Sequence, residues 1–142
     1  MKKIIDNLEI AKKYIKKVKR LHTSNKEVFL NNDAINLSIS MGLFTILNSF
    51  IEIGEEIIVM EDLPIAQTYR EIFEILSENK IINNELGGKL KKYMSYRNMI
   101  AYQYDKFNLE NIFYLAENIN VLEKFVKEIE KYIKNKDKNH SF

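Results

Sequence analysis

The sequence predicts an all-α protein, built as an up-and-down bundle of about five helices. Apolar residues recur along most of the chain at spacings of three and four, which place them on one face of a helix. One proline and four glycines in 142 residues are too few for the many turns of an all-β fold, and no stretch has the alternating pattern of a strand. We therefore expect one helical domain over residues 1–135 and a disordered tail over 136–142.

The first expected helix carries a single apolar stripe, whose members are Ile4, Leu8, Ala11, Ile15 and Val18. The polar stretches 23–25 and 31–33 interrupt this pattern, and Asp33 is expected to cap the N-terminus of the next helix. That second helix is expected over residues 34–60. Because it is apolar on more than one face, it should lie at the centre of the bundle.

The only proline, Pro64, is expected at or near the first position of a third helix that ends near Asn79. Its core residues have helical spacing: Tyr69, Ile72, Phe73 and Leu76. Residues 83–85 are expected to form a loop, and a fourth helix to run from residue 86 to residue 101 or 104. The glycine pair 87–88 should weaken its first turn.

A last helix is expected from about Leu109 to Lys134, with Asn108 as its N-cap. Its apolar residues have the a and d spacing of a heptad repeat: Ile112, Leu115, Ile119, Leu122, Val126, Ile129 and Ile133.

Composition excludes several kinds of site. Without cysteine, disulfides, zinc–thiolate sites, iron–sulfur clusters and thiol catalysis are ruled out. Two histidines, His22 and His140, are too few for a His-rich metal site, and we expect no metal and no cofactor. A net charge of +2 is not that of a protein that coats nucleic acid. The most apolar stretch, 41–53, is shorter than the about 20 residues of a membrane span, and no targeting segment is visible, so we expect a soluble cytoplasmic protein.

One segment, residues 96–104, differs from the rest of the chain. It gathers three tyrosines around Arg97 at the expected end of a helix. Arginine is rare here beside lysine, and lysine cannot replace its planar fork of donors. Tyr104 shares a face with Arg97 on an ideal helix, but Tyr102 lies about 140° away. A joint site of Arg97 and Tyr102 therefore needs the helix to end near Ala101, or needs a second protomer.

Plainer interpretations stay open for each feature. Tyrosines at a helix end commonly pack in a core or an interface, and a lone arginine commonly forms a surface ion pair. The lysines of the first helix are expected to form a solvated face, with RNA phosphate as the alternative partner. A group of acids without a neighbouring histidine is interpreted as a solvated or partner-binding face: Glu52, Glu55, Glu56, Glu61 and Asp62.

The sequence resembles the HepT-like (DUF86) branch of the HEPN domains, all-helical toxins paired with minimal nucleotidyltransferase antitoxins. Residues 51–55, Ile-Glu-Ile-Gly-Glu, resemble the second-helix signature of that family, and residues 64–76 resemble its third helix. The family signature reads Arg-Asn, three residues, His, one residue, Tyr. This sequence matches it at Arg97, Asn98 and Tyr104 but has Tyr102 in place of the histidine.

The resemblance implies a HEPN-like homodimer in which an arginine and a histidine cleave RNA without metal. In such a site, histidine moves protons near neutral pH and the guanidinium stabilises the charged phosphorane. A tyrosine, with an ordinary pKa of about 10, is a poor proton acceptor, although it can stack on a base or donate a hydrogen bond. The resemblance also implies that the partner nucleotidyltransferase modifies Tyr104 with AMP.

Two functions follow. In the first, the chain is a ribonuclease toxin with residual or altered activity, in which Arg97 holds the phosphate, Asn98 orients the site and Tyr102 occupies the position of the base. In the second, it is a non-catalytic HEPN protein that serves as the dimeric binding partner of a nucleotidyltransferase.

Overall fold

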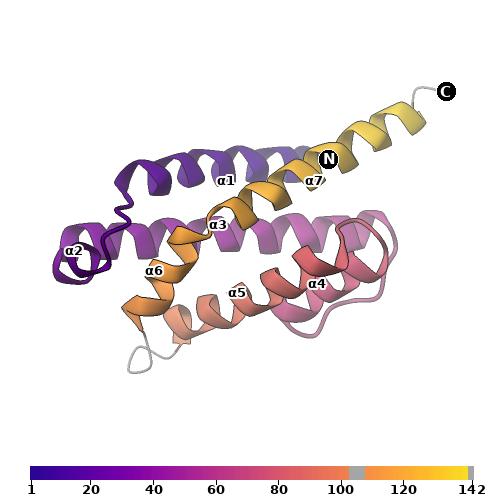
Figure 1. Ribbon diagram of the computed structural model, residues 1–142. Helices are drawn as coiled ribbons and strands as arrows, with labels where there is room; N and C mark the ends of the chain where they lie inside the picture. The colour runs from indigo at the N-terminus through magenta and orange to yellow at the C-terminus, as the bar shows by residue number, and fades with distance from the viewer. Residues whose placement is uncertain (103–107, 141–142) are drawn as a thin grey trace.

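A long central helix organises the molecule. The computed structural model describes residues 1–102 and 108–140, and in this part of the chain every regular element is a helix, which confirms the predicted all-α bundle. The elements follow in the order α1 (Lys2–Leu21), α2 (Lys26–Asn31), α3 (Asp33–Met60), α4 (Tyr69–Glu78), α5 (Asn84–Tyr102), α6 (Leu109–Glu117) and α7 (Asn120–His140). In Figure 1, α3 runs through the middle, with α1 on one side and α4 and α5 on the other.

Helices α1 and α3 form the first half of the core. All five residues of the predicted α1 stripe are buried, and they pack along α3. Helix α3 is the one helix of the described residues that is long and apolar enough to cross a membrane by length and composition. More than half of its most apolar window is buried inside the fold, as expected of a central core helix.

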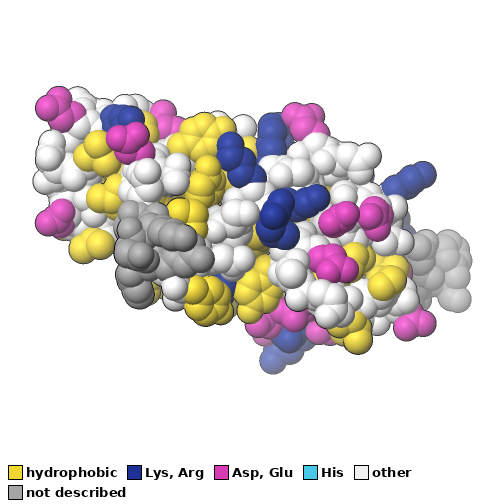
Figure 2. Space-filling model, turned by 90° about the horizontal axis from the view of Figure 1, so that it is seen from below, with side chains coloured by type: hydrophobic (Ala, Val, Ile, Leu, Met, Phe, Trp, Pro, Cys, Tyr) yellow, Lys and Arg dark blue, Asp and Glu magenta, His cyan; other side chains and the backbone are white. Residues whose placement is uncertain are grey.

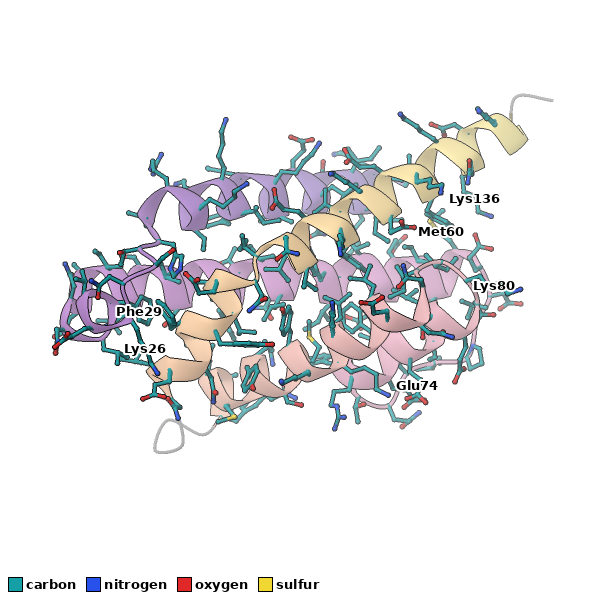
Figure 3. All side chains as sticks on the ribbon, viewed as in Figure 1. Lys26, Phe29, Met60, Glu74, Lys80 and Lys136 are labelled. Carbon is teal, nitrogen blue, oxygen red and sulfur yellow. The ribbon has the colours of Figure 1, made fainter. Side chains whose placement is uncertain are left out.

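The polar stretch between the first two predicted helices contains a short helix that the sequence interpretation missed. Asn25 caps α2 through its side-chain oxygen, and Phe29 of α2 is fully buried. Figure 3 shows Lys26 and Phe29 on α2 beside α6, where Phe29 packs 5.4 Å from the ring of Phe113. The predicted cap of α3 is wrong by one position, because Asn32 is the N-cap and Asp33 is the first helical residue. Either side chain suits a cap, so local chemistry did not decide between them.

Helix α4 begins later than predicted. Pro64 lies in the connection after α3, and the helix starts at Tyr69 with Thr68 as its N-cap. The Thr68 hydroxyl accepts a hydrogen bond from the Glu71 backbone N–H, and the Glu71 carboxylate accepts one from the backbone N–H of Gln67. This reciprocal pattern resembles a capping box, and it fixes the start of the helix more strongly than a proline does.

The predicted last helix is two helices. Asn118 ends α6, where its side chain donates to the Tyr114 carbonyl oxygen at 2.9 Å, and α7 starts two residues later. Asparagine competes with the helical backbone for such bonds, which explains the break inside an unbroken heptad pattern. The predicted N-cap Asn108 is confirmed. Helix α7 continues to His140, so the segment from residue 136, expected to be disordered, is helical through that residue.

Candidate functional site

The C-terminal half of α5 carries Arg97 into the body of the bundle. Its side chain is 8% exposed, although a lone arginine on a helix is ordinarily a surface residue. The Nε atom donates to the side-chain oxygen of Asn48 on α3 at 2.8 Å. One terminal nitrogen donates to the side-chain oxygen of Asn98 at 3.2 Å. Two amide oxygens thus hold the guanidinium in one orientation.

Three aromatic rings complete the surroundings of Arg97. Its guanidinium carbon lies 4.7 Å from the ring centre of Tyr69, 5.1 Å from that of Phe44 and 5.7 Å from that of Tyr102. The negative faces of aromatic rings stabilise a cation without neutralising it. Within residues 1–102 and 108–138, no carboxylate forms an ion pair with Arg97. No carboxylate therefore neutralises its positive charge in this part of the chain.

A cleft of about 530 Å³ lies beside Arg97. It is bordered by Asn98 and Tyr102 of α5, by Glu55 of α3 and by Tyr69 at the start of α4. Tyr102 is 72% exposed at its edge. Figure 2, which views the molecule from the α4 and α5 side, shows acidic, basic and hydrophobic side chains interspersed on this face.

Comparison with known proteins decides the family. A family model described as ribonuclease HepT-like matches residues 11–129. The chain belongs to the ribonuclease HepT-like family. The resemblance to this family predicted from the sequence is confirmed.

Individual relatives agree with this family. The curated mRNA nuclease HepT of Shewanella oneidensis is 24% identical over 115 residues, which cover 81% of this chain and 86% of the relative. Among solved structures, a tri-AMPylated HEPN toxin of Shewanella oneidensis in complex with an MNT antitoxin superposes with a TM-score of 0.84 at 23% identity, covering 92% of this chain and 98% of that one. A cytosolic protein of unknown function from Bacillus subtilis, YutE, superposes with a TM-score of 0.81 at 19% identity, covering 95% and 91%. The two structural matches show a shared fold.

The structure of this HepT-like chain places Arg97, Asn98 and Tyr102 together. The sequence interpretation required either a helix end near Ala101 or a second protomer for a joint site. This requirement is wrong, because Tyr102 is a residue of helix α5 and its ring centre still lies 5.7 Å from the guanidinium carbon of Arg97 in the same chain. Tyr104 lies outside the described residues.

Three site residues were missed as such by the sequence interpretation. Asn48 lies within the most apolar stretch, 41–53, and was not predicted to belong to the site, and Tyr69 was assigned to the core, where it is half-buried. Phe44 was not predicted to have any role in the site. A polar residue in the middle of a buried helix needs a partner, so Asn48 carried a signal that could have been used.

The other predicted features lie elsewhere. His22 forms an ion pair with Glu117 and packs against Phe29 and Phe113, away from Arg97. The described residues contain no group of histidine and acidic side chains that could hold a metal ion. Three lysines of α1 form ion pairs with glutamates: Lys3 with Glu52, Lys12 with Glu130, and Lys19 with Glu123. Two acids of the predicted acidic face are therefore paired with lysines, Glu52 with Lys3 and Glu61 with Lys136 of α7.

Tyrosines near the site differ in their environment. Tyr93, one turn before Arg97 on α5, is buried, and this burial raises its pKa to about 12, so its phenol stays protonated at neutral pH. Tyr102 is exposed at the cleft and so is accessible to a ligand. No histidine lies beside the guanidinium among the described residues.

Proposed function

We propose that this HepT-like chain is the toxin of a toxin–antitoxin pair that acts on RNA in the cytoplasm, with a minimal nucleotidyltransferase as its antitoxin. The observation that carries the proposal is Arg97, a cation held by neutral groups directly behind Tyr69, Asn98 and Tyr102, which line a cleft. The curated relative is an mRNA nuclease, and the solved HEPN toxin is bound to an MNT antitoxin. Both support the proposal.

In this proposal Arg97 binds a phosphate of RNA and stabilises the charge that develops when the 2′-hydroxyl attacks it. Asn98 orients the site, since its side-chain oxygen fixes the rotation of the guanidinium. Tyr102 occupies the position that histidine has in the family signature. Its exposed phenol can donate a hydrogen bond to a phosphate oxygen, but a phenol is a poor acceptor for the proton of the attacking hydroxyl. We therefore expect slow cleavage.

The second candidate function is a non-catalytic partner of the nucleotidyltransferase. It is favoured by the absence of an imidazole near Arg97 in the described part of the chain, because His22 packs against Phe29 and Phe113 and pairs with Glu117 instead. In this case the chain retains its binding surface and no longer cleaves RNA.

An RNA cleavage assay separates the two functions. The full chain is incubated with labelled RNA in the presence of a metal chelator, beside Arg97→Ala and the surface control Arg20→Ala. The toxin function predicts metal-independent cleavage that falls by about 10²-fold or more in Arg97→Ala and is unchanged in Arg20→Ala. RNA that stays intact, together with a stable complex with the nucleotidyltransferase, supports the non-catalytic function.

We further propose that the nucleotidyltransferase silences the toxin by transferring AMP to Tyr104. An adenylate close to Arg97 in sequence adds negative charge that can pair with the guanidinium and mask it from RNA. Incubation with the neighbouring nucleotidyltransferase and ATP, followed by peptide mass mapping, should place the added mass on Tyr104. A mass shift that persists in Tyr104→Phe contradicts this assignment, as does the absence of a shift with an active partner.

A further inference from the structure

The cleft beside Arg97 has the composition of a nucleobase pocket. Its volume of about 530 Å³ lies within the range of ordinary small-molecule sites. Two buried isoleucines, Ile58 and Ile72, give it an apolar floor. Two tyrosines, Tyr69 and Tyr102, stand at its wall. Flat aromatic bases stack on such rings, and this contact contributes about 1–3 kcal/mol for each base in single-stranded nucleic acid.

The two rings also fix where the base would lie relative to the phosphate. Both are within 6 Å of the guanidinium carbon of Arg97, at 4.7 Å for Tyr69 and 5.7 Å for Tyr102. A nucleotide whose phosphate binds Arg97 therefore has its own base within reach of the cleft. Tyr102, which is largely exposed, offers a ring face on which that base can stack.

Glu55 supplies the polar group that can distinguish one base from another. Among the residues that the structure describes, it is the one carboxylate that lines the cleft. It is exposed and forms no ion pair or hydrogen bond with the described residues, whereas Glu52 on the same helix is paired with Lys3. An ionised carboxylate only accepts hydrogen bonds. Guanine presents adjacent N–H donors, N1–H and the N2 amino group, on its Watson–Crick edge, which match the two oxygens of a carboxylate.

We propose that this cleft binds the base of a guanine nucleotide in single-stranded RNA. Glu55 accepts both donors of the guanine edge, Tyr102 stacks on the ring, and Arg97 binds the attached phosphate. The inference rests on the proposed function, since it takes the phosphate at Arg97 as given. The neighbouring cleft, which shares Thr68 and Asn98 with this one, carries charges of both signs: Arg70, Glu71, Glu74, Glu78 and Lys91.

Binding of short, uncleavable RNA tests the proposal. Fluorescently labelled 2′-O-methyl oligonucleotides, one of adenines alone and one with a single central guanine, are titrated with the full chain. We expect the guanine oligonucleotide to bind about fivefold more tightly or better, as a bidentate base contact provides. In Glu55→Gln this preference should disappear, while the adenine oligonucleotide binds as before. Glu52→Gln, the matched control on the same helix, should keep the preference.

The possible failures are distinguishable. Equal binding of both oligonucleotides by the unmodified chain, or a guanine preference that survives in Glu55→Gln, overturns the nucleobase pocket. If binding nevertheless weakens in Arg97→Ala, the proposed phosphate site stands. If neither oligonucleotide binds, or if binding is the same in Arg97→Ala, the phosphate site fails and the base pocket fails with it.

Discussion

At the scale of single residues, the partners of Arg97 decide what its charge can do. A buried cation paired with a carboxylate is neutralised, and one without any partner is costly. Asn48 and Asn98 satisfy its hydrogen bonds, and Phe44 and Tyr69 stabilise its charge. The guanidinium is thus positioned while its charge stays available.

Substitutions of Asn48 should separate the effect of the orientation of the Arg97 guanidinium from the effect of its charge. Asn48→Leu leaves the Nε donor without its acceptor and should lower the free energy of unfolding by about 1–3 kcal/mol, with weaker RNA binding. Asn48→Asp keeps an acceptor but pairs with the guanidinium. It should retain stability and still weaken RNA binding. Chemical denaturation and RNA titration of both variants check this, and unchanged RNA binding in Asn48→Asp would show that the charge of Arg97 is not used.

Tyr102→His should restore the family signature. The substituted imidazole titrates near neutral pH beside an arginine already in place, so we expect faster RNA cleavage with a dependence on pH between about 5 and 8. The measurement is the cleavage rate against pH, with Tyr102→Phe as the control that removes the hydroxyl only. A folded Tyr102→His chain that binds RNA and leaves it intact contradicts the prediction.

At the scale of helices, the contact of α4 with α5 depends on a glycine. A Cβ atom added at Gly87 would lie 2.8 Å from Cβ of Ser77 and 3.3 Å from the Phe73 carbonyl oxygen, whereas one at Gly88 meets nothing within 4 Å. The backbones of the two helices therefore approach closely at Gly87. This approach helps to position the helix that carries Arg97.

The glycine pair provides matched variants. Gly88→Ala should stabilise the protein by up to about 1 kcal/mol, because alanine favours the helix and the position is exposed. Gly87→Ala gains the same helix propensity but must separate α4 from α5, and we expect net destabilisation of about 1–3 kcal/mol. Thermal unfolding of the two variants measures the difference. Equal stabilisation by both alanines would show that α4 can move away from α5 without a loss of stability.

The end of α7 is fixed to the end of α3 by an ion pair that should make stability depend on pH. Lys136 and the Tyr132 hydroxyl both donate to the Glu61 carboxylate, and these hydrogen bonds, Lys136 first, hold the pKa of Glu61 below its ordinary value of 4.5. A lowered pKa means that the folded state favours the charged form. The contribution to stability is therefore complete above about pH 4.5 and is lost as the pH falls through the folded-state pKa.

Lys136→Met should lower the midpoint of thermal unfolding at pH 7, and the difference from the unmodified chain should shrink as the pH is lowered below about 4.5. Lys138→Met, an exposed position two residues on, serves as the control and should have little effect at either pH. A Lys136→Met deficit that is constant across this range would exclude the titration of Glu61 as its cause.

At the scale of the whole molecule, one face of α3 stays exposed beside the site. Leu37, Met41 and Val59 are 60%, 63% and 73% exposed, and they lie within about 40° of one another around an ideal helix. Asn48 and Glu55 project from the same side of this helix, so the exposed apolar face borders the Arg97 site. Large exposed apolar residues gathered on one side commonly mark an interface.

We expect a homodimer through this face, with the two Arg97 sites on either side of one cleft and related by a two-fold axis. Sedimentation at micromolar concentration should give twice the 16.9 kDa of one chain. Met41→Glu should dissociate the dimer. Glu27→Lys, at an exposed position on α2, is the control and should leave the dimer intact. If the unmodified chain sediments as a monomer, the prediction of a shared site is wrong, and the site consists of the residues of one chain alone.

Local sequence patterns predicted the fold class and most of the helical spans, and they marked Arg97, Asn98 and Tyr102 as candidate site residues. These follow from local information: periodic apolar residues define a helix and its buried face, and a short motif marks the family. Helix ends were less certain, because neighbouring residues such as Asn32 and Asp33 are equally good caps, and because Asn118 can break a helix that a heptad pattern continues.

The surroundings of Arg97 follow from the packing of the helices and could not be predicted from local patterns. Asn48 is 49 residues away in sequence, and Phe44 and Tyr69 come from two other helices. Their contact with the guanidinium depends on how α3, α4 and α5 pack, which no local pattern encodes. The cleft with Glu55 arises in the same way, where residues of α3 and α5 meet the start of α4 and the connection before it. Local spacing specifies each helix, whereas a site between helices exists only once their packing has brought distant side chains together.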